Sequence, residues 1–239
     1  NLSASRITEE WKITVSGRNE YRASAFKLSS GDMRRFALRS ADANVRVVRS
    51  VTDHFSVGAN AGTGYSEFRN TQASGAADVS AEYNFYSWKE ATSRQLIGLV
   101  SVGHRYFDYY QPTIFGVTTE NRPVARAILA TESRQTWGNI DGSLRYTRYL
   151  HNASTYSVNF SGRTNIRLSR GLSLELRGDA AKVNDQLFLA RGDASDDEVL
   201  TRTRALATSF RLSGSIGLNF TFGSIYNSIV NPRLDEIGG

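Results

Sequence analysis

Residues 206–222, LATSFRLSGSIGLNFTF, decide the fold class of this chain. Every second residue from Leu206 to Phe222 is apolar, glycine or threonine, and the residues between are small or polar, with Arg211 among them. Only an extended strand sends alternate side chains to opposite faces. The stretch therefore predicts a β-strand with one apolar face and one polar face.

The same period of two recurs along most of the chain. It is clear in six further stretches, residues 11–15, 55–61, 77–85, 140–146, 156–168 and 172–176. It is weaker in residues 36–50, 94–110 and 123–134, which lie between turn signals at suitable distances. By composition, residues 198–210 also fit a short helix as an alternative. The pattern predicts an all-β chain of about ten antiparallel strands.

The length of these patterns separates a membrane barrel from a soluble β-rich domain, which is the alternative. Strands of globular proteins usually have about 5 to 6 residues, whereas several of these patterns continue for longer than the ~9 to 11 residues that cross a bilayer. No stretch reaches the ~20 apolar residues of a spanning helix. We therefore predict a transmembrane antiparallel β-barrel in the bacterial outer membrane, with short periplasmic turns and both termini periplasmic.

Aromatic residues gather at the two ends of the predicted strands, as expected for rings at a membrane interface. The predicted periplasmic girdle consists of Trp11, Phe55, Phe85, Trp88, Trp137, Phe220 and Phe222. The aromatic residues expected at the other rim are Tyr65, Phe68, Tyr106, Tyr109, Tyr110, Tyr149 and Tyr156.

Near the C-terminus, Ser215, Gly217, Phe220 and Phe222 resemble the last-strand signal that the barrel assembly machinery reads. Further stretches are similar to an uncharacterised Gram-negative outer-membrane β-barrel family, related in type to salt-induced outer-membrane proteins: TEEWK at 8–12, DQLFL at 185–189, RALAT at 204–208 and FGSIYN at 222–227. The resemblance implies fold, location and the assembly machinery as a partner, but no activity. The C-terminal stretch departs from the usual last-strand signal because residues 223–239 follow Phe222.

Two segments follow from this interpretation: a barrel over residues 1–222 and a C-terminal periplasmic tail over residues 223–239. The tail contains Ile225, Tyr226, Ile229 and Val230, so it is more apolar than expected for an unstructured chain end. We therefore expect it to plug the barrel or to dock a protein partner.

Charged residues fall on the polar face of the predicted strands. The residues expected to face the lumen are Lys12, Arg18, Glu20, Arg22, Asp42, Arg46, Asp78, Glu82, Arg105, Arg126, Glu132, Arg134, Asp141, Arg145, Arg163, Arg167, Glu175, Arg177, Asp179 and Arg211. One interpretation is an arginine–carboxylate network that fills the barrel, which gives the protein a structural or interaction role, alone or within a larger envelope assembly. The alternative is a narrow anion-preferring channel, because rings of arginine select anions.

Other functions find little support in the sequence. The chain has no cysteine and only three scattered histidines, so we expect no metal and no cofactor. His104 with Asp108, and His151 with Ser154, are weak candidates for a hydrolase site, and we expect no enzyme. Basic residues are spread among acidic ones, so we expect no nucleic acid; arginines at the rims suit outer-membrane lipid and lipopolysaccharide. The acidic loop 193–198 is interpreted as solvated rather than as a calcium site.

Overall fold

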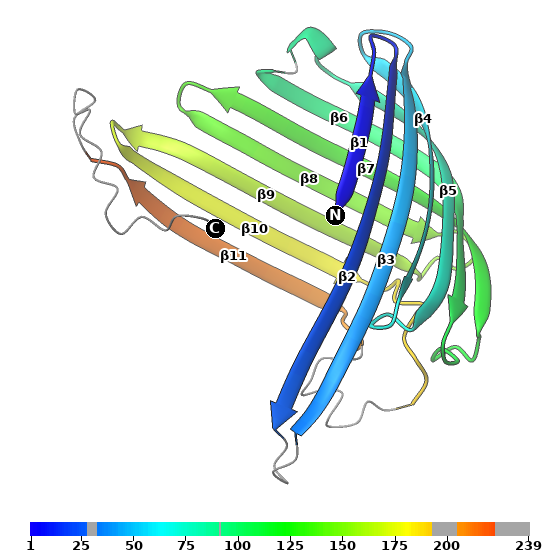
Figure 1. Cartoon of the computed structure of the whole chain (residues 1–239). Helices are drawn as coiled ribbons and strands as arrows, with labels where there is room; N and C mark the ends of the chain where they lie inside the picture. Colours follow the sequence, from blue (N-terminus) through cyan, green and yellow to red (C-terminus); the bar gives the residue numbers. More distant parts are fainter. Residues whose placement is uncertain (28–32, 91, 193–204, 223–239) are drawn as a thin grey trace.

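The computed structural model of the chain describes residues 1–27, 33–90, 92–192 and 205–222. These residues form one antiparallel sheet of eleven strands, each paired with its neighbours in sequence order (Figure 1). The strands are β1 (Leu2–Ile7), β2 (Trp11–Lys27), β3 (Met33–Ser50), β4 (Phe55–Ser66), β5 (Thr71–Asn84), β6 (Arg94–Tyr109), β7 (Thr119–Gln135), β8 (Gly138–Tyr149), β9 (Tyr156–Ser169), β10 (Leu172–Val183) and β11 (Phe210–Phe220), with the short 3-10 helix η1 (Trp88–Glu90) before β6. The predicted all-β antiparallel architecture is confirmed.

The sheet is open, which differs from the predicted closed barrel of about ten strands. Its order begins at β1 and ends at β11, and these two edges do not pair. The additional strand β1 folds back along β2 and pairs with residues 12–17. It therefore occupies part of the edge at which β2 would meet β11 in a closed antiparallel barrel. The final strand is also shorter than the 206–222 pattern, and residues 205–209 form no helix.

The connections alternate between two ends of the sheet. We call one the short-turn end, with connections at residues 8–10, 51–54, 85–93, 136–137 and 170–171. We call the other the long-loop end, with connections at residues 28–32, 67–70, 110–118, 150–155 and 184–209. β2 begins and β11 ends at the short-turn end, whereas Asn1 lies away from both ends because β1 runs back along β2 (Figure 1).

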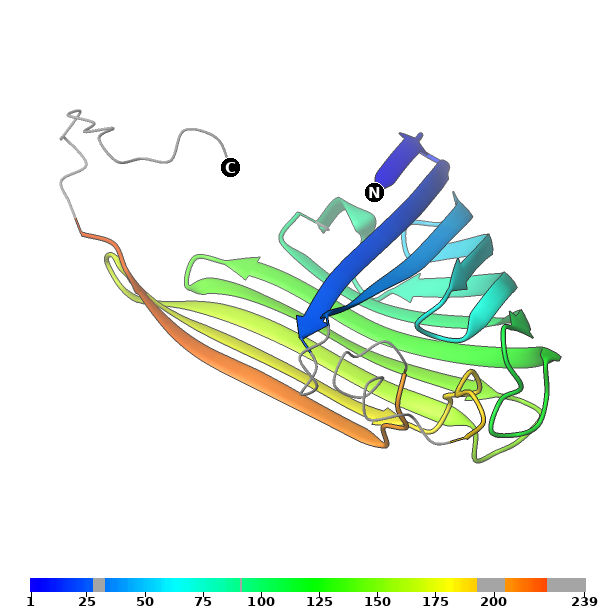
Figure 2. The ribbon, with the colours of Figure 1, turned by 60° about the horizontal axis from the view of Figure 1, so that its bottom comes forward.

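Alternation and curvature together define an inner and an outer face. Figure 2 shows that the sheet bends strongly between β2 and β11. In β6, Val100 and Val102 are 59% and 55% exposed, whereas Ser101 between them is 6% exposed. Because neighbouring residues of a strand point to opposite faces, the polar face lies inside the curve and the apolar face lies outside it.

The strand register keeps like residues together across the sheet. One outward row joins Val47, Ala59, Val79 and Val102 through four neighbouring strands. No helix among the described residues is long and apolar enough to cross a membrane.

The main buried cluster lies at one end of the inner face and not at the centre of the sheet. Val124, Tyr149 and Leu187 pack together with Phe107 against them. Leu187 comes from the connection between β10 and β11, so a loop supplies part of this core.

Candidate functional site: the inner face

All twenty charged residues predicted to face a lumen lie on the same face of the sheet. The register shows this where Arg46 pairs with Asn60 and Asn60 with Asp78, in β3, β4 and β5. The register places four more of them on this face, because Glu132, Asp141, Arg163 and Arg177 are successive partners across β7 to β10. This face is the inner one, to which Ser101 also belongs.

Only some of these residues form ion pairs. The pairs are Arg22–Glu20, Arg105–Asp78, Arg134–Glu132, Arg163–Glu175 and Arg177–Glu175. Among the described residues, Arg46, Arg126, Arg145 and Arg211 have no carboxylate oxygen within 4.0 Å. The inner face therefore carries arginines beyond those that its carboxylates neutralise.

The most enclosed pair lies midway along the strands. Both terminal nitrogens of Arg105 donate to Asp78 Oδ2 at 3.3 Å, and Asn60 Nδ2 donates to the same oxygen at 3.3 Å. The side chains of Arg105 and Asp78 are 15% and 7% exposed. A charge pair this sheltered is screened little by salt.

Three further arginines surround this pair. Arg126 lies close enough to Arg105, Arg145 and Arg46 for their charges to oppose its own, with Asp78 as the opposing carboxylate. We call Arg46, Arg105, Arg126 and Arg145 the arginine cluster. Two carboxylates oppose these four guanidinium groups, Asp78 and Glu82, which lies close to Arg46, so the cluster is a positively charged zone on the inner face.

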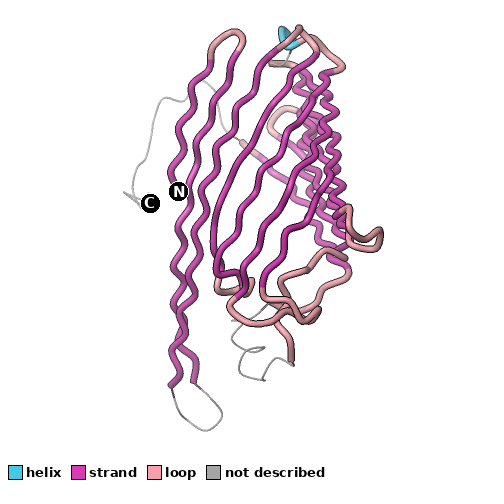
Figure 3. The backbone as a smooth tube through the Cα atoms, turned by 90° about the vertical axis from the view of Figure 1, so that its right-hand side faces the viewer, coloured by secondary structure: helices cyan, strands magenta, loops and turns pink. Residues whose placement is uncertain are grey.

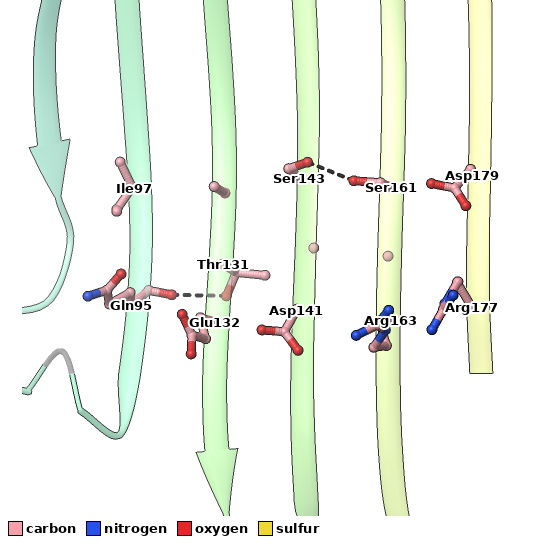
Figure 4. A pocket seen from close by; sticks show the side chains of 13 residues that line it. Gln95, Ile97, Thr131, Glu132, Asp141, Ser143, Ser161, Arg163, Arg177 and Asp179 are labelled. Atoms are coloured by element: carbon pink, nitrogen blue, oxygen red, sulfur yellow. Dashed lines mark hydrogen bonds between the residues drawn. The ribbon is translucent and has the colours of Figure 1, made fainter. Parts of the chain in front are cut away.

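A charged hollow of about 530 Å³ lies on the inner face of β6 to β10. Figure 4 shows Glu132 and Asp141 side by side on β7 and β8, at the level of Arg163 and Arg177 on β9 and β10. Acidic and basic groups therefore occupy separate halves of one row. A second hollow of about 370 Å³ includes Arg145 on β8 and Arg211 on β11, which share one row of the register with Asn159 and Ala181 between them.

The long-loop end of the inner face is covered by residues 184–192, which we call the cap segment. Its backbone pairs with the 110–118 loop, where Ile114 N donates to Leu189 O and Arg191 N donates to Pro112 O, both at 2.8 Å. After residues 193–204, Ala205 N donates to Phe68 O at 3.2 Å, on the connection between β4 and β5. The β10–β11 connection thus contacts loops on well-separated strands.

A buried polar group lies beside the cap segment and was missed by the sequence prediction. The Tyr109 hydroxyl donates to Glu120 Oε1 at 2.5 Å, and Arg122 Nε donates to Glu120 Oε2 at 2.7 Å. The alternation over residues 123–134 begins at Pro123 and therefore leaves Glu120 and Arg122 outside the predicted strand. Glu120, Arg122 and Arg126 are all even-numbered, so the alternation of a strand places them on one face. This alternation is the sequence signal that could have identified Glu120 and Arg122.

The aromatic residues expected at the two rims are distributed differently. Trp11, Phe55 and Phe220 terminate strands at the short-turn end; Phe85, Trp88 and Trp137 lie in its turns, and Phe222 follows the end of β11. At the other end, Tyr109 and Tyr149 are 3% and 8% exposed. These two tyrosines end β6 and β8 at the long-loop end, where they were expected, but their side chains lie on the inner face under the cap segment and not in an interfacial girdle.

The histidine pairs considered as catalytic candidates do not assemble. His104 Nδ1 lies 3.3 Å from Asn121 Oδ1, and Ser154 N donates to Asn152 Oδ1. Among the described residues, neither histidine of these pairs hydrogen-bonds to its proposed partner. Burial, together with the Arg122 charge, holds the pKa of His151 below its ordinary value. No group of three or more histidine or acidic side chains in the described ranges could hold a metal ion.

Comparisons with known proteins give one structural likeness. No protein-family model matches the chain. No curated protein matches it either. A solved structure of NanC porin superposes on 92% of this chain and 97% of its own, with a TM-score of 0.41 and 10% sequence identity.

Proposed function

We propose that the chain is an integral outer-membrane β-barrel with a narrow, anion-preferring interior. One observation carries the membrane part of the proposal: the outer face is apolar and exposed from β2 to β11. On β11 alone, Leu212, Ile216 and Leu218 are 71%, 78% and 70% exposed. A face this extensive is unfavourable in water, whereas lipid chains would cover it.

Strand length and loop length support the same placement. The strands from β2 to β11 have 11 to 18 residues, which exceeds the minimum for a bilayer crossing. Barrels of this class keep short turns in the periplasm and longer loops outside. The short-turn end would therefore face the periplasm and the cap segment the exterior. Closure would require β1 to leave residues 12–17 of β2, after which β2 would join β11 and no backbone edge would remain in lipid.

The anion preference rests on the arginine cluster. Of the twenty charged residues predicted to face the lumen, twelve are basic and eight are acidic. Glu120 and Arg122, which also lie on this face, add one charge of each sign. Uncompensated guanidinium groups in a narrow passage lower the energy of an anion and raise that of a cation. The cluster adds to this because its four guanidinium groups outnumber Asp78 and Glu82, the carboxylates that oppose them.

The test is the reversal potential of the refolded protein in a planar bilayer under a potassium chloride gradient. We expect a sign that reports chloride preference, and a shift toward zero in the Arg126→Gln, Arg145→Gln double variant. Arg134→Gln is the control, because that arginine is paired with Glu132 and its side chain is 68% exposed. A conducting wild type with cation preference would contradict the proposal.

A second candidate is a barrel with a filled interior and a structural or interaction role. The cluster of Val124, Tyr149 and Leu187 favours it, because it closes over part of the inner face. Electrical silence of correctly inserted protein would support this role over the channel. The proposed docking of residues 223–239 to a protein partner lies outside the described residues.

A further inference from the structure

The hairpin of β2 and β3 extends beyond the rest of the sheet at the long-loop end, as Figure 3 shows. β4 accompanies β3 only from Ser40 to Ser50, and β1 accompanies β2 only over residues 12–17. Residues 21–27 and 33–39 therefore form strand pairs only with each other. The Arg39 backbone also bonds to the β4–β5 connection, where Glu67 N donates to Arg39 O at 3.1 Å and Arg39 N donates to Glu67 Oε2 at 2.7 Å. We call these residues the β2–β3 ribbon.

The outward face of this ribbon carries two arginines with small alanine side chains between them. Tyr21 pairs with Arg39, Ala23 with Ala37, and Ala25 with Arg35. Both arginines are exposed, and the Arg39 guanidinium lies 5.8 Å from the centre of the Tyr21 ring, which is 63% exposed. Four residues of strand separate Arg35 from Arg39 by about 13 Å, with small alanine side chains between them.

The height of this face matches a lipid headgroup layer. On the outward face of β2, Trp11 lies at the short-turn end and Tyr21 lies ten residues later. At ~3.3 Å per residue and a tilt of ~45°, these ten residues rise roughly 23 Å, close to the ~25 Å apolar band of a transmembrane barrel. Tyr21 then lies at the outer interface, and Arg39 and Arg35 lie at and just above it.

We propose that Arg35 and Arg39, with Tyr21 and the alanines between them, bind the phosphorylated sugar headgroup of lipopolysaccharide in the outer leaflet. Guanidinium groups bind phosphate in a bidentate manner. Their spacing suits a disaccharide with a phosphate at each end, and the alanines let a sugar ring approach the strands. This inference rests on the proposed outer-membrane location and adds a ligand site that is separate from the inner face.

The opposite face of the ribbon offers a matched control. Arg22 belongs to the inward-facing positions, pairs with Glu20 at 3.2 Å and has a side chain that is 67% exposed. Arg22→Gln removes the same charge from the same ribbon as Arg39→Gln. It leaves the outward face unchanged.

The experiment titrates the detergent-solubilised full chain with deep-rough lipopolysaccharide and measures bound lipid by native mass spectrometry. From the usual contribution of one basic residue at an anionic surface, Arg35→Gln and Arg39→Gln should each weaken binding about fivefold and the double variant roughly thirty-fold. Arg22→Gln should leave affinity unchanged. Dephosphorylated lipopolysaccharide should bind the wild type as weakly as intact lipopolysaccharide binds the double variant.

Three outcomes would overturn the site: an unchanged double variant, an equal loss in Arg22→Gln, or equal binding of dephosphorylated lipid. Competition by millimolar inorganic phosphate would also do so, because it would identify free phosphate as the ligand. Insertion of the wild type into phospholipid vesicles is measured in parallel. Failure to insert refutes the membrane proposal, whereas normal insertion with unchanged lipid binding refutes only this site.

Discussion

The Ser157 hydroxyl donates a 2.6 Å hydrogen bond to Asp185 Oδ2 and so joins the inner face of β9 to the cap segment. Ser157 is 6% exposed. Removal of a donor from a sheltered carboxylate costs about 1 to 3 kcal/mol. We therefore expect Ser157→Ala to loosen the cap segment and to speed proteolysis within residues 184–209 of the folded protein. Ser161→Ala is the control, because that hydroxyl bonds to Ser143 in an exposed position; equal cleavage rates would count against the anchor.

Gly103 marks a close approach of two strands beside the arginine cluster. A Cβ atom there would lie 2.1 Å from Ala77 O and 2.6 Å from Asp78 Cα. Gly103→Ala should therefore lower the free energy of unfolding by roughly 1 to 3 kcal/mol, as overpacking does. The measurement is the urea midpoint of the micelle-refolded protein.

Gly178 provides the matched control for that substitution. A Cβ atom added at Gly178 meets nothing within 4 Å, although it also lies inside a strand. Gly178→Ala should leave the urea midpoint nearly unchanged. If both variants behaved alike, the close approach at Gly103 would not be the cause.

Asp78→Asn should increase the preference for anions in a conducting barrel. The substitution removes one of the carboxylates that oppose the arginine cluster, whereas an amide oxygen can still accept hydrogen bonds from Arg105 and Asn60. The expected result is a reversal potential further in the anion direction than that of the wild type. Glu20→Gln, on β2 just before the ribbon, should have a smaller effect. A shift toward cations after Asp78→Asn would refute the role of the cluster.

His151 should titrate below the ordinary value of an exposed histidine. Its pKa is lowered first by burial and then by the Arg122 charge, against which Glu120 acts in the opposite direction. A lowered folded-state pKa means that the folded protein resists protonation, so this group disfavours the fold as pH falls below the unfolded value of about 6.5. NMR titration of the three histidines checks this, and Arg122→Gln should raise the His151 pKa.

Assembly by the barrel assembly machinery should depend on Phe220 more than on Phe210. Both are outward-facing residues of β11, 62% and 61% exposed, at its end and its start. The resemblance to a last-strand signal concerns the end of the strand. We expect Phe220→Ala to reduce the heat-modifiable form recovered from outer membranes, and Phe210→Ala to reduce it less. Equal recovery of the two variants would argue against a signal at this position.

The two faces of the sheet could be predicted from sequence because alternation is a local property. Leu212, Ile216 and Leu218 are exposed on one face, and Arg211 lies on the other, as the period of two requires. β1 could not be predicted in this way. Its residues alternate poorly, since Arg6 shares a face with Leu2 while Ile7 falls with the serines. Pairing with β2 defines this strand, and that contact is not local.

The cap segment was also beyond reach of the sequence. Its position depends on the bridge between Thr113 and Ala190, which are far apart in the chain. The predicted strand begins too late, at Pro123, because a proline inside a strand usually indicates an edge. In the structure Pro123 pairs opposite His104 of β6, while the ladder with β8 begins only at Val124.

Because of the short strand β1, the two edges of the sheet differ in how readily they can pair with another strand. On the β2 side, any incoming strand must first displace the six residue pairs that join β1 to residues 12–17. On the β11 side, residues 210–220 offer an uncovered row of backbone donors and acceptors, which is a template for another strand. Before the sheet closes, growth into aggregates should therefore be directional, starting at β11, because the six residues of β1 protect the β2 edge only.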